Sequence, residues 1–342
     1  MHTETAGKAM EPVDLIIIGG GPVGLFGAAL AGLHGMKVQI VESLPELGGQ
    51  LAAVYPEKIV YDVGGFKAVR AKDLVAALVD QALAQRPEVF LGEQVERIEE
   101  DAKGLLHVVT RRGEHVARLV LVTAGIGAFA PRRLPAEGAD LFEGRGVHYF
   151  VPSFAQFAGR RVAIVGGGDT AVDWALAISE FAEQVLLIHR RSGFRAHEAS
   201  LMQLLELPHV RLLAPAELRA VLGEAEVEAI RVEWTEAQRS EEIAVDDVVS
   251  GLGFVPNLGP MKGWGFTWEG PRIVVRSHSM ETDRPRVFAA GDVATYPGKV
   301  VLIATGFGEV VLAVSRMRQI LHPEASPHLP HSSNMELSAT LG

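Results

Sequence analysis

The chain has 342 residues, 48% hydrophobic and 22% charged, with a formal net charge of −10 at pH 7. This length is enough for two domains with full hydrophobic cores. The acidic balance argues against a general nucleic-acid-binding protein, because such proteins present a net basic surface. The sequence contains no cysteine, which excludes disulfides, iron–sulfur ligation, thiolate zinc sites and a redox-active dithiol. The histidines show no HExxH spacing, so no metal site is expected.

Residues 15–33 form an uncharged stretch close to the length of a membrane-spanning helix. Three consecutive glycines and Pro22 would break such a helix, so a strand, a tight turn and a helix are expected instead. Residues 1–12 lack the apolar core and cleavage site of a signal peptide. We therefore expect a frayed N-terminal segment and a cytoplasmic protein that binds no membrane.

The first glycine-rich segment lies between a strand and a helix. Residues 13–18 are, apart from Asp14, an apolar run rich in β-branched side chains, which is typical of a buried parallel strand. We expect a helix over 22–35 and a second strand over 37–41, with Glu42 directly after it. This order of elements is that of a dinucleotide-binding βαβ unit.

Each glycine of this segment has a role in such a unit. Gly19 allows the tight turn, Gly21 lets the backbone approach a pyrophosphate, and Gly24 permits the helix to pack on the strand. Glu42 follows Gly24 by eighteen residues, where an acid accepts hydrogen bonds from an adenosine ribose. The N-terminus of the helix also favours the phosphates. The alternative is a glycine-rich turn in another α/β fold.

A second fingerprint repeats this design with one difference. Strands are expected over 161–165 and 184–188, with a helix over 170–179 between them. The predicted binding residues of the turn are Gly166, Gly168, Asp169, Thr170 and Ala171, the last in place of the third glycine. The second strand ends at His189, at the same offset from Ala171 as Glu42 has from Gly24, so the acid is missing there.

Basic residues take the place of the acid at this second site. His189, Arg190 and Arg191 stand at the end of the strand, and Arg195 follows shortly after. Guanidinium groups pair with phosphate, whereas a carboxylate would repel it. The substitution favours a ribose with a 2′-phosphate, so the first site suits FAD and the second NADPH. The alternative is that these arginines form a solvated surface.

The chain closely resembles the ferredoxin–NADP reductases of the thioredoxin-reductase-like type over nearly its whole length. Besides the two fingerprints, the matching motifs lie at 42–44, 48–51, 55–58, 61–63, 123–125, 127–129, 253–257, 291–293 and 304–309. The resemblance implies an α/β fold of two Rossmann-like dinucleotide-binding domains. The FAD domain would comprise residues 1–126 and 251–342, with the NADP(H) domain, 127–250, inserted into it.

The resemblance also implies the remaining cofactor contacts. The residues that match the family's FAD-binding positions are Glu42, Gly49, Gln50, Tyr55, Val95, Phe129, Asp292 and Val293. Tyr55 is expected to lie on one face of the flavin, unless it belongs to the core. On the other face, the C-terminal tail, 322–342, would place His331, with Ser333 nearby, unless the tail is disordered. Asp292 would bond the ribityl chain, unless it only forms a turn.

The family's sister group, the thioredoxin reductases, has a CxxC motif whose two cysteines align with Tyr149 and Pro152. These residues form no thiolate or disulfide, so the electrons must leave directly from the flavin. The sequence thus predicts an oxidoreductase that transfers a hydride between NADPH and FAD N5 and passes single electrons to ferredoxin or flavodoxin. No side chain is assigned as an acid–base catalyst. A homodimer is implied by the resemblance.

Two other functions remain open at this point. The first is an NADPH-dependent flavin oxidase or diaphorase that reduces quinones or other small acceptors. The second is a non-catalytic NADPH-sensing flavoprotein. Acidic carriers would be repelled by the net charge of the chain, but a basic patch of Lys58, Lys67, Arg70 and Lys72 could steer docking. These residues are otherwise scattered solvated charges.

Overall fold

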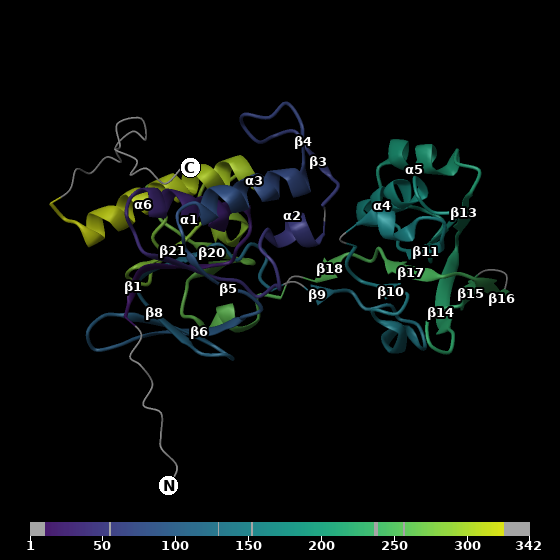
Figure 1. The fold of residues 1–342 in the computed structure, drawn as a ribbon, viewed down its shortest axis with the longest axis horizontal. Helices are drawn as coiled ribbons and strands as arrows, with labels where there is room; N and C mark the ends of the chain where they lie inside the picture. The colour runs from purple at the N-terminus through teal and green to yellow at the C-terminus, as the bar shows by residue number, and fades with distance from the viewer. Residues whose placement is uncertain are drawn as a thin grey trace, which may run out of the picture. The chain divides into compact units, whose positions relative to one another are not determined.

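The computed structural model describes residues 11–54, 56–128, 130–151, 153–235, 239–255 and 257–324. The chain forms two compact units. The first unit consists of residues 1–128 and 256–342, and the second unit of residues 129–255. The first unit therefore combines an N-terminal and a C-terminal stretch, drawn in purple to blue and in green to yellow in Figure 1, and the second unit is continuous.

The first unit is built on a seven-stranded sheet with a mainly parallel core. Along the sheet the strands run in the order β5 (Glu88–Phe90), β2 (Val38–Val41), β1 (Val13–Ile18), β8 (Glu114–Val122), β7 (Leu106–Thr110) and β6 (Val95–Glu100), with β21 (Val287–Ala289) also paired to β8. Strands β5, β2, β1, β8 and β21 pair in parallel, and β6 and β7 pair antiparallel.

Helices and short strands complete the first unit. The helices are α1 (Pro22–Leu33), α2 (Gly49–Ala53), α3 (Ala71–Leu83) and α6 (Ile303–Leu321). The small sheets contain β3 (Ile59–Val60), β4 (Val69–Arg70), β19 (Trp268–Glu269), β20 (Arg272–Val274) and β22 (Ala294–Thr295), and the 3₁₀ turns are η3 (Gly259–Gly263) and η4 (Gly291–Val293).

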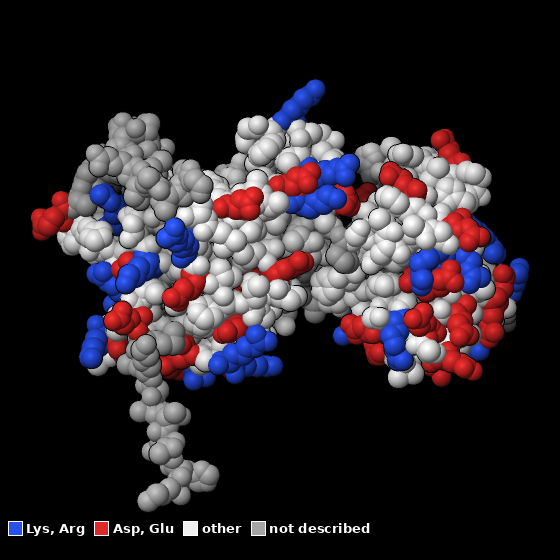
Figure 2. Space-filling model, viewed as in Figure 1, with Lys and Arg blue, Asp and Glu red and all other residues white. Residues whose placement is uncertain are grey.

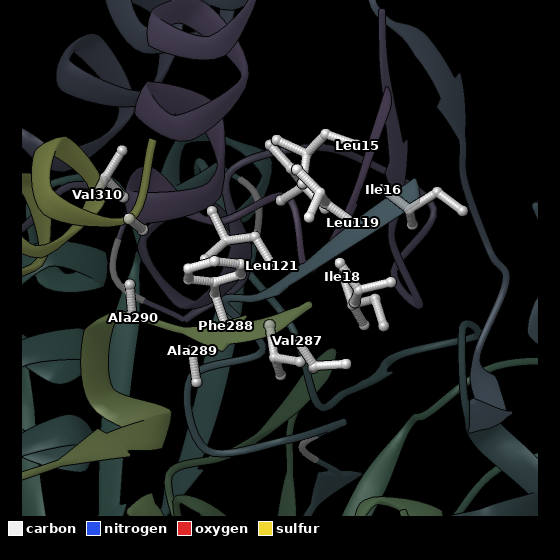
Figure 3. Packing of buried hydrophobic residues seen from close by; sticks show 14 of the residues in the cluster. Leu15, Ile16, Ile18, Leu119, Leu121, Val287, Phe288, Ala289, Ala290 and Val310 are labelled. Atoms are coloured by element: carbon white, nitrogen blue, oxygen red, sulfur yellow. The ribbon is translucent and has the colours of Figure 1, made fainter. Parts of the chain in front are cut away.

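The core of the first unit forms where α1 and α6 pack on the parallel strands. Strand β1 is apolar on both faces, as expected for a strand buried between layers. Figure 3 shows its leucine and isoleucine side chains beside those of β8, with Phe288 of β21 and Val310 of α6 completing the cluster. These strands are therefore rigid supports for the loops that leave their carboxyl ends.

The second unit contains a five-stranded parallel sheet. Its strands run in the order β10 (Val147–His148), β17 (Asp247–Ser250), β11 (Arg161–Val165), β12 (Gln184–Ile188) and β13 (Val210–Leu213). Helices α4 (Asp169–Ser179) and α5 (Glu198–Leu205) and 3₁₀ turns η1 (Ala139–Phe142) and η2 (Phe154–Phe157) accompany it. Its buried side chains form two further hydrophobic clusters.

An antiparallel sheet and a pair of short strands complete the second unit. The antiparallel sheet consists of β14 (Ala216–Leu222), β15 (Ala229–Trp234) and β16 (Arg239–Ala244). The chain enters this unit through β9 (Ala130–Pro131) and leaves it through β18 (Phe254–Val255), and these two strands pair antiparallel. One paired connection therefore joins this unit to both stretches of the other.

The predicted α/β class with two dinucleotide-type sheets is confirmed. Strands β1, β11 and β12 and helix α4 match their predicted ranges to within one residue. Helix α1 ends two residues earlier than predicted, because Gly35 adopts a left-handed φ of +80° soon after it. Within the described residues, no helix is both long and apolar enough to cross a membrane.

Candidate functional site

The glycine-rich turn after β1 requires two of its glycines for folding. Gly19 has a left-handed φ of +107°, and an added Cβ would lie 2.7 Å from the carbonyl oxygen of Thr123. An added Cβ on Gly24 would lie 2.0 Å from the carbonyl oxygen of Gly19. The Thr123 hydroxyl also donates to that oxygen over 2.8 Å. Together these contacts hold the first turn of α1 against the ends of β1 and β8.

Gly21 is open where the other two glycines are crowded. Its φ of −73° is accessible to any residue, and an added Cβ would meet nothing closer than the Cα of Gly49 at 3.9 Å. Packing within the protein therefore does not explain a glycine at this position. A bare backbone at the N-terminus of a helix lets a phosphate group approach closely. Gly21 thus fits the predicted pyrophosphate cradle, with Gly49 at its side.

Glu42 lies at the end of β2, with only 5% of its surface exposed. One carboxylate oxygen, Oε2, accepts the backbone N–H of Gly20 over 2.6 Å. The other, Oε1, accepts the backbone N–H of Leu44 over 2.8 Å and the Ser43 hydroxyl over 3.1 Å. The carboxylate therefore fixes the glycine turn, and its remaining lone pairs can accept hydroxyl groups of a ligand.

Asp292 lies in turn η4, directly after β21, and is half-buried. Burial raises the pKa of its carboxyl group, although the cationic Lys299 and Arg272 nearby oppose this effect. The structure shows no hydrogen bond to this carboxylate from any residue that it describes. An incompletely buried carboxylate without a protein partner is an acceptor available to a ligand hydroxyl.

The other predicted residues of the first unit divide into three groups. Gln50 lies on α2, and its Nε2 is 3.5 Å from the position of an added Cβ on Gly125, which places it by the loop after β8. The side chains of Val95 and Val293 are buried in the core, so only their backbone could contact a cofactor. Four predicted positions lie outside the described residues, namely Tyr55, Phe129, His331 and Ser333.

The glycine turn of the second unit follows the same division of roles. An added Cβ on Gly166 would lie 2.4 Å from the carbonyl oxygen of Gly251, and the side chain of Ala171 packs against both glycines. Gly168, in contrast, has an ordinary φ of −105° and nothing within 4 Å of an added Cβ. Gly168 therefore occupies the place that Gly21 has in the first unit, at the N-terminus of α4.

The segment after β12 folds back on this turn. The N–H of Arg195 donates to the carbonyl oxygen of Gly167 over 2.8 Å, and the Asp169 carboxylate accepts the N–H of His197 over 3.0 Å. Asp169 thus holds the segment, whereas Thr170 is the second residue of α4. His197 was not predicted, and no local sequence signal identifies its role, because the contact is made through its main chain.

His189 packs against the glycine turn and is followed by Arg190 and Arg191. An added Cβ on Gly167 would lie 2.3 Å from its ring, and the ring packs on Phe194 with centroids 4.7 Å apart. Burial lowers the pKa of His189, and the neighbouring arginines lower it further. The ring is therefore favoured in its neutral form, in which one nitrogen can donate and the other accept.

The guanidinium groups of Arg190, Arg191 and Arg195 are exposed and carry no ion pair with any described residue. Elsewhere in the second unit, arginines such as Arg160 and Arg219 pair with carboxylates. Since no described carboxylate pairs with Arg190, Arg191 or Arg195, these guanidinium groups, which follow β12, can bind a dianionic phosphate without breaking an ion pair of the described chain.

Tyr149 occupies the first of the two positions that a dithiol would need. It is 2% exposed, its hydroxyl accepts the N–H of Leu134 over 3.3 Å, and the Arg133 guanidinium lies 4.6 Å from the ring centroid. Pro152, at the second position, lies outside the described residues. Among the described residues, no group of three or more His, Asp or Glu side chains could hold a metal ion.

Three residues near Asp292 were not assigned a role from the sequence. They form a polar network that bonds the main chain of Gly291 and consists of Lys299, Glu309 and Tyr296. The only sequence signal is a lysine and a glutamate ten residues apart, on either side of the start of α6. Glu309 was included in the matching motif at 304–309, but without a function.

Comparison with known proteins agrees with this geometry. The family model of the pyridine nucleotide-disulphide oxidoreductases matches residues 13–315. A protein named ferredoxin–NADP reductase 2 from Shouchella clausii is 47% identical over 323 residues, which covers 94% of this chain and 97% of that protein. Its counterpart of the same name from Bacillus subtilis is 46% identical over 322 residues, with 94% and 96% covered.

Solved structures show the same fold. Lactococcus lactis thioredoxin reductase superimposes with a TM-score of 0.70 at 22% identity, covering 90% of this chain and 99% of that one. Thioredoxin reductase from T. acidophilum gives the same TM-score at 24% identity, with 91% and 99% covered. The chain belongs to the pyridine nucleotide-disulphide oxidoreductases and, within them, to the thioredoxin-reductase-like ferredoxin–NADP reductases, whose cofactors are FAD and NADP(H).

Proposed function

We propose that this chain is a ferredoxin–NADP reductase whose first unit binds FAD and whose second unit binds NADPH. One observation carries the choice among related activities: the chain has the fold of thioredoxin reductases but contains no cysteine. Without cysteine the chain has no disulfide that could accept electrons from the reduced flavin, so the flavin must pass them directly to an external acceptor. The names of the relatives at 46–47% identity support ferredoxin as that carrier.

The first unit provides three features that suit FAD. Gly21 leaves room for the pyrophosphate, Glu42 can accept from the adenosine ribose, and Asp292 offers a carboxylate without a partner among the described residues. The N-terminus of α1 adds a favourable field for the phosphates. We further propose that Gln50 and Gly49 line this site and that Tyr55 and His331, with Ser333, contact the flavin ring.

The second unit provides the selectivity for NADPH over NADH. Gly168 leaves the pyrophosphate space at the start of α4. The 2′-phosphate, which NADH lacks, would be bound by Arg190, Arg191 and Arg195. His189 would support the segment that carries them, since its ring packs on Phe194. Because these guanidinium groups carry no ion pair with described residues, binding would not require a protein contact to be broken.

When bound, FAD supplies the chemistry that accepts a hydride from NADPH and releases single electrons to a carrier. The residues of the chain bind and orient the two cofactors, and none of them is required as an acid or base. Glu42 and Asp292 would hold the cofactor at two separate points, the adenosine ribose and the ribityl chain, and so help to orient the reactive ring.

The partner proposals extend this function. We propose that ferredoxin or flavodoxin is the carrier, that the enzyme is a cytoplasmic homodimer, and that local contacts rather than net charge direct docking. Figure 2 shows basic and acidic side chains intermingled on the visible face of each unit, without one extended basic area. At cellular salt only close charges contribute, because the Debye length is about 8 Å.

A panel of carriers tests the proposal. NADPH-reduced protein is mixed with ferredoxin, flavodoxin, a quinone and thioredoxin at several salt concentrations, and the reduction of each is followed. We expect ferredoxin or flavodoxin to be reduced and thioredoxin not. Turnover on the quinone alone would favour a diaphorase, and a flavin that NADPH does not reduce would favour a non-catalytic sensor.

A further inference from the structure

A buried ion pair in the first unit holds both polar main-chain groups of Gly291. The side chains of Lys299 and Glu309 are 5% and 1% exposed and form a direct ion pair. Lys299 Nζ also donates to the carbonyl oxygen of Gly291 over 3.1 Å. Glu309 Oε2 accepts the N–H of the same residue over 2.8 Å. The two oppositely charged side chains therefore bond the N–H and the carbonyl oxygen of the same residue.

Tyr296 completes this network. Its hydroxyl donates to Glu309 Oε1 over 2.8 Å. Burial, together with the neighbouring Glu309 carboxylate, raises the pKa of Tyr296 to about 12. The phenol therefore remains a protonated donor at physiological pH, and Glu309 acts as the acceptor for three groups. Each of the three side chains of the network is thus satisfied by the others or by Gly291.

Stability alone is a weak explanation for this pair. Removing two charges from water costs several kcal/mol per ion, and apolar residues of similar volume are often as stable or more stable. What apolar side chains cannot do is bond the N–H and the carbonyl oxygen of Gly291. That residue has a left-handed φ of +79°, and an added Cβ would lie 3.2 Å from Val23 at the start of α1. Gly291 is therefore held tightly against the glycine turn.

The main chain of Asp292 is fixed in consequence. The residue before it is held by the ion pair, and its own carbonyl oxygen accepts a hydrogen bond from Arg272 Nε over 3.0 Å. Its carboxylate, in contrast, has no hydrogen-bond partner within the described part of the chain. The network, acting on Gly291, and Arg272, acting on the carbonyl oxygen of Asp292, thus hold the backbone around a side chain that has no partner among the described residues.

We propose that Lys299 and Glu309 are positioning residues, which hold Gly291 so that the Asp292 carboxylate meets the FAD. Neither residue needs to touch the cofactor, because both act through the main chain. Tyr296 orients the Glu309 carboxylate for this role. The inference rests on the proposed binding of FAD by the first unit and adds residues to that same site.

The test compares two double variants that carry the same charge. K299M/E309L replaces the pair with apolar side chains, whereas K299M/E309Q keeps an amide oxygen that can accept the N–H of Gly291. Apoprotein stability is measured by chemical unfolding, and FAD affinity by titrating the apoprotein with FAD while flavin fluorescence is followed. The visible circular dichroism of bound FAD reports the surroundings of the ring. R286M is the control, because Arg286 precedes β21 but bonds Gly104 and Glu100 instead.

We expect K299M/E309L to unfold at a lower denaturant concentration than the wild type, because the main-chain groups of Gly291 lose their partners. Under conditions where the variant is folded, it should bind FAD about tenfold more weakly, the equivalent of one lost buried hydrogen bond. K299M/E309Q should regain part of this affinity and of the wild-type dichroism, and R286M should keep both. The inference is overturned if K299M/E309L binds FAD like the wild type, or if affinity follows unfolding stability in every variant. Failure of wild-type apoprotein to bind FAD would instead overturn the proposed function.

Discussion

Replacement of Glu42 by glutamine tests how the first glycine turn is held. The two carboxylate oxygens accept the backbone N–H groups of Gly20 and Leu44 over 2.6 and 2.8 Å. Glutamine has one oxygen acceptor, so one of these N–H groups would face an NH₂ group and lose its partner. An unsatisfied buried donor costs about 1–3 kcal/mol. We expect E42Q to lower the free energy of unfolding of the apoprotein by this amount.

The same substitution should weaken FAD binding by about tenfold or more, because the turn loses a hydrogen bond and the proposed acceptor for the ribose is altered. Chemical unfolding of the apoprotein and fluorescence titration with FAD measure the two effects. S43A is the matched control, since it removes only the hydroxyl that donates to Glu42 and leaves both backbone bonds. An E42Q protein with wild-type stability and wild-type FAD affinity would refute this reasoning.

Three further predictions address the other site residues. Gly168→Ala should leave the free energy of unfolding unchanged, because the φ of Gly168 is ordinary and nothing lies within 4 Å of an added Cβ. It should weaken NADPH binding about tenfold, because the methyl group would occupy the space proposed for the pyrophosphate. A loss of stability would contradict the open surroundings of Gly168. Changing Arg190 and Arg191 to alanine should raise the KM for NADPH relative to NADH by about ten- to a hundredfold, whereas equal changes would mean that these arginines do not read the 2′-phosphate. The raised pKa of Asp292 means that its ionisation opposes folding, so stability is lost as pH rises from its ordinary pKa of 3.8 through the raised value. D292N apoprotein should therefore become more stable than the wild type as pH rises over this window, while its FAD affinity falls; parallel stability curves would contradict this assignment.

Local patterns were sufficient to predict the two βαβ units. Buried strands such as β1 and β11 are almost wholly apolar, with Asp14 and Arg161 as their only charged residues, and the glycines after them mark the turns. The structure adds the reason for each glycine: Gly24 is required by its distance to Gly19, whereas Gly21 is left open. The spacing alone could not separate these two roles.

The Lys299–Glu309 network could not be predicted in the same way. Its residues are separated along the chain, and Gly291 takes part through its main chain, which leaves no signal in side-chain pattern. The antiparallel strands β14 to β16 were also not predicted from the sequence. Tertiary contacts of this kind become visible only when the loops are placed in space.

One rapid-mixing experiment follows electrons from NADPH through the flavin to ferredoxin in this protein without thiols. FAD-loaded protein is mixed with NADPH, and the flavin absorbance is followed before and after a second mixing step with oxidised ferredoxin. We predict that NADPH bleaches the flavin at least as fast as the enzyme turns over in the steady state. Ferredoxin should then restore the flavin absorbance as it is itself reduced. A flavin that NADPH bleaches but that neither ferredoxin nor flavodoxin reoxidises would contradict the proposed function.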